Sequence, residues 1–358
     1  MRAFLNFYRN IQYFIFGRDK LGAMSGGENV KVEHFRYEVN HGDIVHPCVR
    51  YISDGYLGHY WWMAYTPYYK NDSSLENPVL CYAEGNDPNT PPAEWKYFCL
   101  VNEKPLNGYN SDPTLLFYKG TLYVFWRENY DANCEGYNRA TYAAKVAVNG
   151  IERIADPLLV TEDSEMDPET CPCFMPSKED YVMAYGMHLR FHSPFIKKMK
   201  PVFRRWAEKI TLITDLLGGY SQQKHYGLAI WRQGDSNWLK PYKLVKTIEF
   251  KNCNKLYRPW HMDFFDYNGK RYAIVQTNQS NADLSLAVSE DYENFSFFKH
   301  PVLTNLNINK LGIYKPCAGV TPDGRFYLYY TAQDKDNRSL NKLYLTTIGF
   351  DELLKRIK

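Results

Sequence analysis

The sequence predicts an all-β protein, a five-bladed β-propeller, and two repeated observations carry this prediction. In the first, a polar or reactive residue stands before a proline that opens an apolar stretch, at His46-Pro47, Asp112-Pro113, Cys171-Pro172, Arg258-Pro259 and Lys315-Pro316. In the second, an aromatic-rich run follows each proline, in most repeats after a tight turn with Gly or Asp. Repeats of this length with three or four short strands each are typical of radial blades.

The second and third strands of each repeat are indicated by short β-rich runs. The second strands are HYWWMAY (59–65), TLYVFWRE (121–128), YVMAYG (181–186), RYAIVQ (271–276) and FYLYYT (326–331). Turns such as YNGKRY and PDGRFY precede them, so each blade is expected to begin with a hairpin. Third runs follow, for example NPVLCYAEG and LSLAVSE. We expect the strand within VKVEHFRYEV (30–39) to complete the last blade.

The proline steps also predict where the axis lies. Proline cannot donate to a sheet ladder, so it is tolerated at the start of a strand, and it holds the preceding residue in an extended conformation. The first strand of every propeller blade lines the central axis. The residues before the prolines are therefore expected to converge on one funnel at the mouth of the axis, as a ring of His46, Asp112, Cys171, Arg258 and Lys315.

Residues 1–29 are expected to form an extension outside the propeller, which spans 30–358. Apolar residues such as Phe4, Phe7 and Ile11 recur at roughly helical spacing, which predicts a short amphipathic N-terminal helix. Arginines interrupt this segment, so it does not resemble a secretory signal, and a cytoplasmic location is expected. The helix docks on the propeller or contacts a membrane surface or a partner.

Composition agrees with one large β domain. The chain has 358 residues, of which 45% are hydrophobic and 16% aromatic, enough to build a substantial core of sheets. The formal charge of +3 is mild, and no basic stripe interleaved with aromatic residues occurs in the blades. Nucleic acid is therefore not expected as a partner.

Blade three is longer than the others, and its extra residues predict a helical insertion at 187–225. Phe203, Trp206 and Ile210 follow helical spacing, basic residues crowd the first half, and Gly218-Gly219 is a natural stop. The insertion joins the second and third strands, so it should overhang the funnel. Either it is a packed helix with a solvated basic side, or it is a lid that recruits an acidic glycan or a lipid head group.

Strand topology selects the other residues that can reach the funnel. Second strands end on this face, and first strands begin there. The substrate-binding candidates are Tyr65, Glu76, Arg127, Glu128, Arg258, Trp260, His261 and Lys315. Of these, Arg127 and Glu128 end an otherwise apolar strand, so they either bind a ligand or neutralise each other.

The cysteines do not predict a metal site. Cys48, Cys173 and Cys317 follow blade prolines at equivalent positions, where a small buried residue suits the crowded axis. Cys171-Pro-Cys173 has no second Cys or His pair at zinc-ligand spacing. We therefore expect neither a metal nor a cofactor.

Several segments resemble the blades of glycoside hydrolase family 43. They are HPCVRYISDGYLGHYWWMAYTPYYKNDSSLENPVLCYAEGND, SDPTLLFYKGTLYVFWRE, RPWHMDFFDYNGKRYAIV and YKPCAGVTPDGRFYLYYTAQD. The HP-V, YWMAYTPY and ENP arrangement is more similar still to a group of uncharacterised, often phage-associated propellers. The resemblance runs from about residue 40 onward except for the insertion, and it implies the five-bladed fold.

The resemblance also implies a set of catalytic residues. Family 43 places an acidic base in blade one, an orienting acid in blade two and a glutamic acid in blade three. Only the second is matched directly, by Asp112, because blade one has His46 and Glu169 is displaced by one residue from the motif. Cleavage of a glycosidic bond ordinarily needs two carboxyl groups. We expect Asp112 with Glu169 and His46 as the catalytic set, and Glu76 or Glu128 as alternative partners.

Two classes of function remain open from the sequence. The first is a glycosidase acting on a poly- or oligosaccharide, which is acidic if His46, Arg258 and Lys315 hold an anionic group. The second is a propeller that binds glycans without catalysis. A third possibility is a cytoplasmic protein of capsule or lipopolysaccharide assembly, held at the membrane by the N-terminal helix or the basic insertion.

Overall fold

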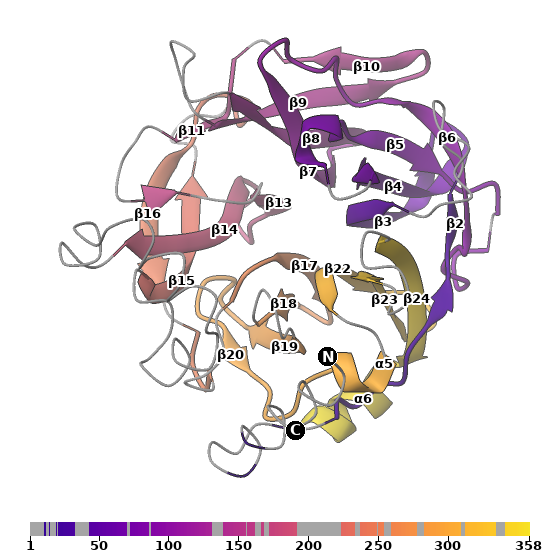
Figure 1. Cartoon of the computed structure of the whole chain (residues 1–358), viewed down its shortest axis with the longest axis vertical. Helices are drawn as coiled ribbons and strands as arrows, with labels where there is room; N and C mark the ends of the chain where they lie inside the picture. Colours follow the sequence, from indigo (N-terminus) through magenta and orange to yellow (C-terminus); the bar gives the residue numbers. More distant parts are fainter. Residues whose placement is uncertain are drawn as a thin grey trace.

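The computed structural model describes residues 11, 14, 19, 21–32, 43–69, 72–85, 87–130, 139–154, 156–161, 166–167, 172–191, 223–232, 237–248, 250–253, 259–277, 283–308, 312–333 and 341–358. Within these residues five β-sheets surround a central axis (Figure 1). The predicted all-β, five-bladed propeller is therefore confirmed.

Each sheet forms one blade, whose long strands pair antiparallel in chain order from the axis outward, while short strands pair beside them. Blade one contains β3 (Ile44–Tyr56), β4 (His59–Pro67), β5 (Val79–Tyr82) and β6 (Glu94–Leu100). Blade two contains β7 (Gly108–Tyr118), β8 (Thr121–Tyr130), β9 (Arg139–Ala147), β10 (Gly150–Arg153) and β11 (Leu159–Thr161). Blade three contains β12 (Met166–Asp167), β13 (Cys173–Pro176), β14 (Val182–Phe191), β15 (Gln223–Arg232) and β16 (Lys243–Ile248).

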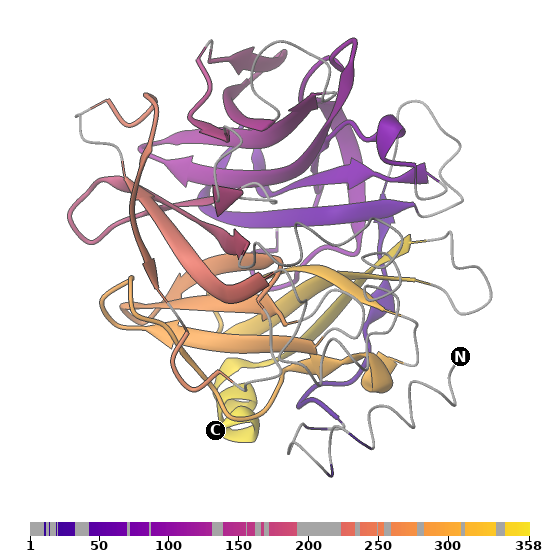
Figure 2. The same cartoon turned by 60° about the vertical axis from the view of Figure 1, so that its left-hand side comes forward.

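Blade four contains β17 (Met262–Tyr267), β18 (Lys270–Gln276), β19 (Asp283–Ser289), β20 (Ser296–Phe297) and β21 (Leu303–Thr304). Blade five contains β22 (Ile313–Val320), β23 (Arg325–Gln333), β24 (Asn341–Gly349) and β1 (Glu28–Asn29). The short helices are η2 (Ser73–Leu75), α5 (Asn305–Ile308) and α6 (Phe350–Ile357). Helix α6 lies against blades four and five (Figure 2).

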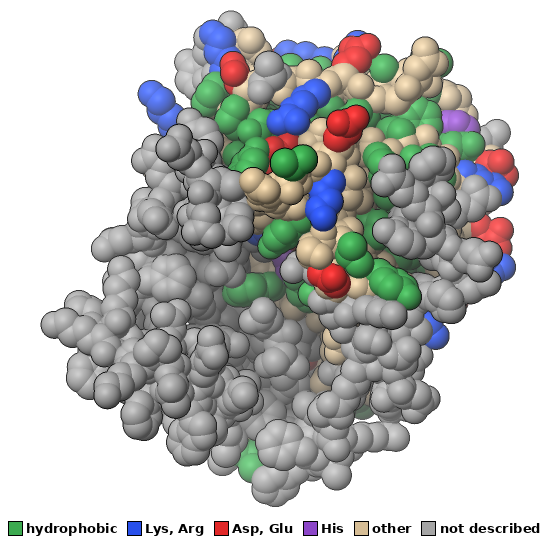
Figure 3. Space-filling model, turned by 45° about the horizontal axis from the view of Figure 1, so that its top comes forward, with side chains coloured by type: hydrophobic (Ala, Val, Ile, Leu, Met, Phe, Trp, Pro, Cys, Tyr) green, Lys and Arg blue, Asp and Glu red, His purple; other side chains and the backbone are tan. Residues whose placement is uncertain are grey.

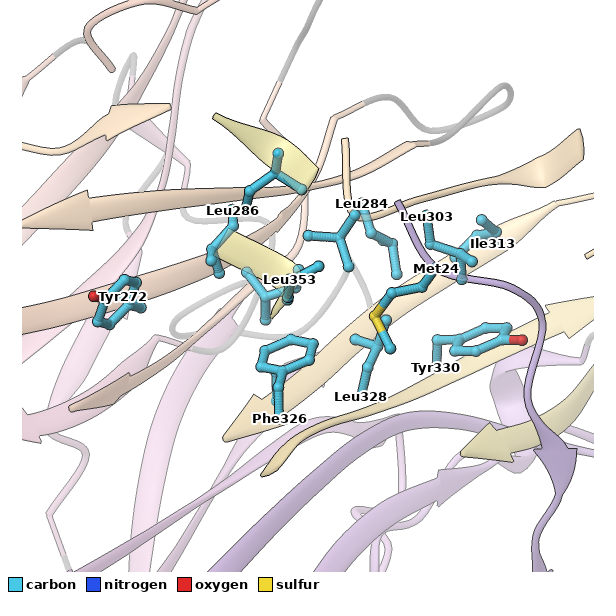
Figure 4. Packing of buried hydrophobic residues seen from close by; sticks show 14 of the residues in the cluster. Met24, Tyr272, Leu284, Leu286, Leu303, Ile313, Phe326, Leu328, Tyr330 and Leu353 are labelled. Carbon is cyan, nitrogen blue, oxygen red and sulfur yellow. The ribbon is translucent and has the colours of Figure 1, made fainter. Parts of the chain in front are cut away.

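The hydrophobic core consists of five clusters, and each one fills the interface between two neighbouring blades. The alternation of strand side chains produces this arrangement, because successive residues point to opposite faces of a sheet. Trp61 and Trp62 are adjacent in β4, yet Trp61 packs against blade five and Trp62 against blade two. Figure 4 shows the interface of blades four and five, which Met24 and Leu353 help to fill.

The N-terminal segment closes the ring. β1 pairs with β24 in blade five, and β2 (Lys31–Val32) then pairs in parallel with β6 in blade one. An N-terminal strand thus completes the last blade as expected, but with residues 28–29, while residues 33–42 lie outside the described part. The fold begins before the predicted boundary at residue 30, since Met24 is already buried.

A buried ion pair on the axis connects all five blades. Arg50 of blade one donates to both carboxylate oxygens of Asp263 in blade four, at 2.7 and 3.0 Å. Arg50 Nε also donates to the Leu115 carbonyl of blade two at 3.1 Å. Asp263 accepts the Ala318 N–H of blade five at 3.3 Å, and the Cys173 thiol of blade three lies 3.6 Å from Oδ1.

The predicted insertion and N-terminal helix lie largely outside the described residues. β14 reaches Phe191 and β15 begins at Gln223, so both ends of the predicted range 187–225 are strand, and 192–222 is not described. The insertion joins the second and third strands of its blade, as expected. Among the described residues, none of the helices is long and apolar enough to cross a membrane.

Candidate functional site

Three of the five proline steps lie together in the innermost strands of their blades and share a backbone irregularity. His46, Asp112 and Lys315 have positive φ angles of 55°, 52° and 26°. In each case the residue and its proline together oppose a single residue of the neighbouring strand, so the ladder shifts there. Such bulges are known to redirect side chains. The expectation of an extended residue before each proline is wrong at these positions, because the bulge places the residue in the left-handed region.

These bulges, together with β17, bring two imidazoles to one carboxylate. His46 Nε2 lies 3.2 Å from Asp112 Oδ1, and His261 Nδ1 lies 4.0 Å from the same oxygen. All three residues are buried, and one ligand atom from each lies within 4.8 Å of the others. Among the described residues, Asp112 Oδ1 and both ring nitrogens of His261 make no hydrogen bond. Buried polar atoms without partners are rare and costly, so this cluster is built to receive a ligand.

The other carboxylate oxygen of Asp112 is held firmly. Arg127 Nη2 lies 2.6 Å from Asp112 Oδ2, and the Ser111 hydroxyl donates to it at 3.1 Å. Arg127 and Asn129 in turn donate to the Ser111 hydroxyl oxygen. Asp112 therefore presents Oδ1 alone to the cluster, with Oδ2 fixed by partners behind it.

The electrostatic environment favours, for each of the three side chains, the protonation state that can bind a metal ion. Burial lowers the pKa of His46 to about 3, aided by Lys315 and Arg127 against the opposing charge of Asp112. Burial likewise lowers the pKa of His261 far below its usual range. Burial alone would raise the pKa of Asp112, but Arg127 first, with Lys315 among the further contributors, lowers that pKa. The cluster thus holds two neutral imidazoles and one carboxylate at neutral pH.

This set of side chains fits a divalent metal ion. Neutral imidazole and carboxylate are common ligands of catalytic zinc and related metals, and ligand atoms at about 2.1 Å from one ion lie roughly 3–4 Å apart. The separations of 3.2 and 4.0 Å from Asp112 Oδ1 match this range, and the cluster as a whole, within 4.8 Å, would contract slightly around an ion. The Nδ1 atom of His46 lies 3.4 Å from the Thr66 hydroxyl, whereas Nε2 faces Asp112 Oδ1 at 3.2 Å and the Tyr314 hydroxyl at 3.1 Å, so an ion bound at Nε2 would replace these two contacts. Metal-binding histidines usually have such an outer partner on the second nitrogen. The sequence-based expectation of no metal considered only the cysteine motif and missed this set.

Glu76 and Tyr314 complete the site. Glu76 follows η2 and is 6% exposed. Burial, and next the negative charge of Asp112, raise its pKa to about 9, while Arg127 opposes the shift. The Tyr314 hydroxyl lies 3.1 Å from His46 Nε2, and its ring stands edge-on to His261 at 4.7 Å. A phenol therefore contacts the two histidines, and a protonatable carboxyl lies close enough to Asp112 and Arg127 for their charges to shift its pKa.

The raised pKa of Glu76 predicts a pH-dependent stability that Glu76→Gln removes. The unfolded chain titrates near the ordinary value of 4.5 and the folded metal-free protein near 9, so between them the folded state retains a proton that the unfolded state releases. Wild-type stability therefore falls as pH rises across this window, by up to about 1.4 kcal/mol per pH unit. In urea unfolding with chelator present, the free energy of unfolding of the Gln variant should rise relative to that of the wild type between pH 5 and pH 8. A constant difference would contradict the assignment.

Several predicted site residues lie at or near this cluster, and others do not. Asp112, His46, His261, Arg127 and Glu76 gather at the cluster. The Lys315 ammonium is buried at the axis and donates to the Pro113 carbonyl at 3.3 Å. Trp260 is half-buried, with its ring 6.1 Å from that of His261. Glu169, Cys171 and Arg258 lie outside the described residues.

Two candidates point away from the funnel. Tyr65 is 1% exposed and belongs to the core between blades one and five. Glu128 neighbours Arg127 in β8, so its side chain points to the opposite face of the sheet. There it contacts Asn102, Trp126, Tyr130 and Arg153. Of the two alternatives left open for this pair, mutual neutralisation is therefore excluded, since Arg127 pairs with Asp112 and Glu128 with Arg153.

Sequence reasoning missed Ser111 and Tyr314. Ser111 and Tyr314 directly precede the bulge residues Asp112 and Lys315, and Thr66 pairs with Val45, which precedes His46. The residues before and opposite each proline step were thus a usable signal. Figure 3 shows one face of the molecule, where acidic, basic and hydrophobic side chains are mixed.

Comparisons with known proteins show the fold. No family model matches the chain, and no curated protein matches it. An N-acetylgalactosamine deacetylase from F. plautii, solved with blood group B trisaccharide, has a TM-score of 0.65 and 12% identity, covering 95% of this chain and 98% of its own. A thermostable family-43 glycoside hydrolase has a TM-score of 0.56 and 12% identity, and the match covers 87% of this chain and 92% of the hydrolase.

A GH43_1 enzyme from Xanthomonas citri, complexed with xylotriose, has a TM-score of 0.55 and 12% identity, and the match covers 86% of this chain and 88% of that enzyme. These identities are too low to carry activity from one protein to another. The resemblance to family 43 propellers is confirmed for the architecture: this chain has the five-bladed fold that carbohydrate-active enzymes of two different chemistries share.

Proposed function

We propose that this protein is a carbohydrate-active hydrolase that uses a divalent metal ion to remove an acyl group, such as N-acetyl, from a sugar. The observation that carries the proposal is the cluster of His46, Asp112 and His261. Its buried ligand atoms gather within 4.8 Å of one another, and three nitrogen and oxygen atoms of these residues make no hydrogen bond among the described residues. The fold similarity to a structure named as a sugar deacetylase supports it.

The chain's own residues fit hydrolysis of an amide or ester. A divalent ion held by His46, Asp112 and His261 would act as a Lewis acid that polarises a carbonyl and lowers the pKa of water. Asp112 stays ionised through Arg127, and the two imidazoles stay neutral through burial. Glu76 accepts a proton from the attacking water and returns it to the leaving amine or alcohol. A nearby dication opposes the effect of Asp112 on Glu76 and so favours the basic form.

Tyr314 is placed to stabilise the charge that develops on the acyl oxygen. Burial raises its pKa well above the usual range, so its hydroxyl keeps its proton and donates. Such donors in a dry site are effective when they are fixed before the reaction begins. The balanced reaction consumes one water and yields the deacylated sugar and a carboxylate.

A second candidate, cleavage of a glycosidic bond, is favoured by one observation. Glu76 has a raised pKa and Asp112 a lowered one, and paired carboxyl groups with separated pKa values are typical of an acid and a base. The glycosidase expected from the sequence would then use Glu76 as acid in place of Glu169. In that case a metal ion would not be required.

Product analysis separates these two functions. The purified protein is treated with chelator, reloaded with Zn²⁺, Mn²⁺ or Ca²⁺ in parallel, and incubated with acetylated and matched unacetylated oligosaccharides. We expect released acetate, no new reducing ends, and activity that depends on the added metal. New reducing ends that persist in chelator would instead establish the glycosidase. Binding of glycans without any product would leave only the non-catalytic alternative.

The proposal does not extend to an anionic substrate. Of the residues expected to hold an acidic group, His46 is neutral because burial lowers its pKa to about 3, and Arg258 lies outside the described residues. The cations beside the cluster are Lys315, which is 3% exposed, and Arg127, which is bound to Asp112 and Ser111. Both positive charges thus serve the protein's own carboxylate. We propose a neutral acylated sugar in the funnel.

A further inference from the structure

A buried asparagine joins the strand that carries Asp112 to the loop that carries Glu76. Asn110 lies in β7, two residues before Asp112, and is completely buried. Its backbone N–H donates to the Glu76 carbonyl at 3.4 Å. Its side-chain Nδ2 donates to Asn77 Oδ1 at 2.8 Å and to the Glu103 carbonyl at 3.0 Å. Both hydrogens of this amide group are therefore used to hold neighbouring loops.

Asn77 extends the connection on the other side of Glu76. Its Nδ2 donates to the Asn102 carbonyl at 2.9 Å, in the loop between β6 and β7. Residues 76–77 are thus held by β7 directly and by the β6–β7 loop. The only regular structure just before them is η2, which has three residues and is too short to fix a side chain by itself.

We propose that Asn110 is a positioning residue that sets the Glu76 carboxyl relative to the metal-binding cluster. The inference rests on the proposed function, in which Glu76 transfers the proton. Asn110 and Asp112 belong to one strand, so a displacement of β7 moves the Glu76 loop and Asp112 together. The spacing of the proton-transferring group from the ligand atoms is thereby preserved.

The expected effect of losing this connection falls on the chemical step. Asn110→Ala removes both side-chain hydrogen bonds and leaves Asn77 Oδ1 without this donor. A misplacement of about 1 Å at a reacting group can reduce a rate about 100-fold. We therefore expect kcat for deacylation to fall by about 100-fold, with KM changed by less than about threefold and metal affinity unchanged.

Asn102→Ala is the matched control. Asn102 belongs to the same pair of loops, but its Nδ2 donates to Glu128 Oε1 at 2.8 Å, on the face of blade two that points away from the cluster. The substitution removes one side-chain amide and keeps the backbone carbonyl that accepts from Asn77. We expect a loss of thermal stability similar to that of Asn110→Ala, with kcat within about twofold of wild type.

A second readout does not depend on activity. Hydrogen exchange of the metal-loaded protein should show faster exchange in residues 73–77 for Asn110→Ala and for Asn77→Ala, but not for Asn102→Ala. Asn77→Ala also serves if Asn110→Ala does not fold, and should lower kcat in the same direction.

The outcomes separate this inference from the proposed function. The positioning role would be overturned if Asn110→Ala or Asn77→Ala keeps the wild-type kcat, or if hydrogen exchange in residues 73–77 is unchanged. Deacylation by the wild type would still stand in that case. A fall in kcat that Asn102→Ala matches would also overturn it, because the effect would then be general loosening. If the wild type releases no acyl group, the proposed function is wrong, and the exchange data alone decide whether Asn110 fixes the loop.

Discussion

Replacing His261 by alanine is expected to abolish divalent metal binding and with it the deacylation activity. His261 supplies one of three ligands, and both of its ring nitrogens are buried without a hydrogen bond among the described residues. Loss of the ion removes several kcal/mol of charge stabilisation, which corresponds to a rate decrease of about 1000-fold or more. Titration calorimetry with Zn²⁺ and Mn²⁺, together with acetate release, measures both effects.

His59→Ala is the control for this substitution. His59 lies in β4 at the far end of its hairpin, where it stacks on Tyr82 with ring centroids 3.9 Å apart. We expect metal affinity and activity to remain at the wild-type level. If His261→Ala binds metal as tightly as His59→Ala does, the three-residue site is refuted.

The second large effect concerns the axis. Asp263→Ala leaves the Arg50 guanidinium buried without its carboxylate and removes acceptors that serve blades three and five. Breaking one partner of a buried pair typically costs about 3–5 kcal/mol. We expect the free energy of unfolding of the metal-free protein to fall by about that amount, measured by guanidinium denaturation.

Glu290→Ala tests whether any lost carboxylate in blade four has this effect. Glu290 pairs with Lys270 on the surface at 2.7 Å, and its side chain is 79% exposed. Exposed pairs contribute little because water and salt screen them. The stability of this variant should stay close to wild type. Equal losses in Glu290→Ala and Asp263→Ala would show that the axial pair does not hold the blades together.

Much of the fold was predictable because it repeats. Strand alternation, hairpin turns and proline steps are local signals, and each occurs in several blades. The ring closure by an N-terminal strand also follows from local pattern. The strand that closes the ring was misplaced, because residues 28–29 pair through backbone atoms and carry no alternation to detect.

The site was harder to predict, since its geometry depends on backbone conformation at single residues. His46 and Asp112 were identified from the proline steps, but the positive φ that turns them toward each other was not. Glu128 looked equivalent to Arg127 in sequence, yet strand alternation sends it to the other face. The metal ligands come from three blades far apart in the chain, so no local spacing reveals them.

The central claim is that His46, Asp112 and His261 bind one divalent ion. The most direct measurement is anomalous diffraction from crystals of the full chain soaked in Mn²⁺ or Zn²⁺, collected on both sides of the metal absorption edge. We predict one strong peak about 2.0–2.3 Å from a nitrogen of each histidine and from Asp112 Oδ1. If crystals soaked to saturation in the metal show no anomalous peak between these three residues, the account is contradicted.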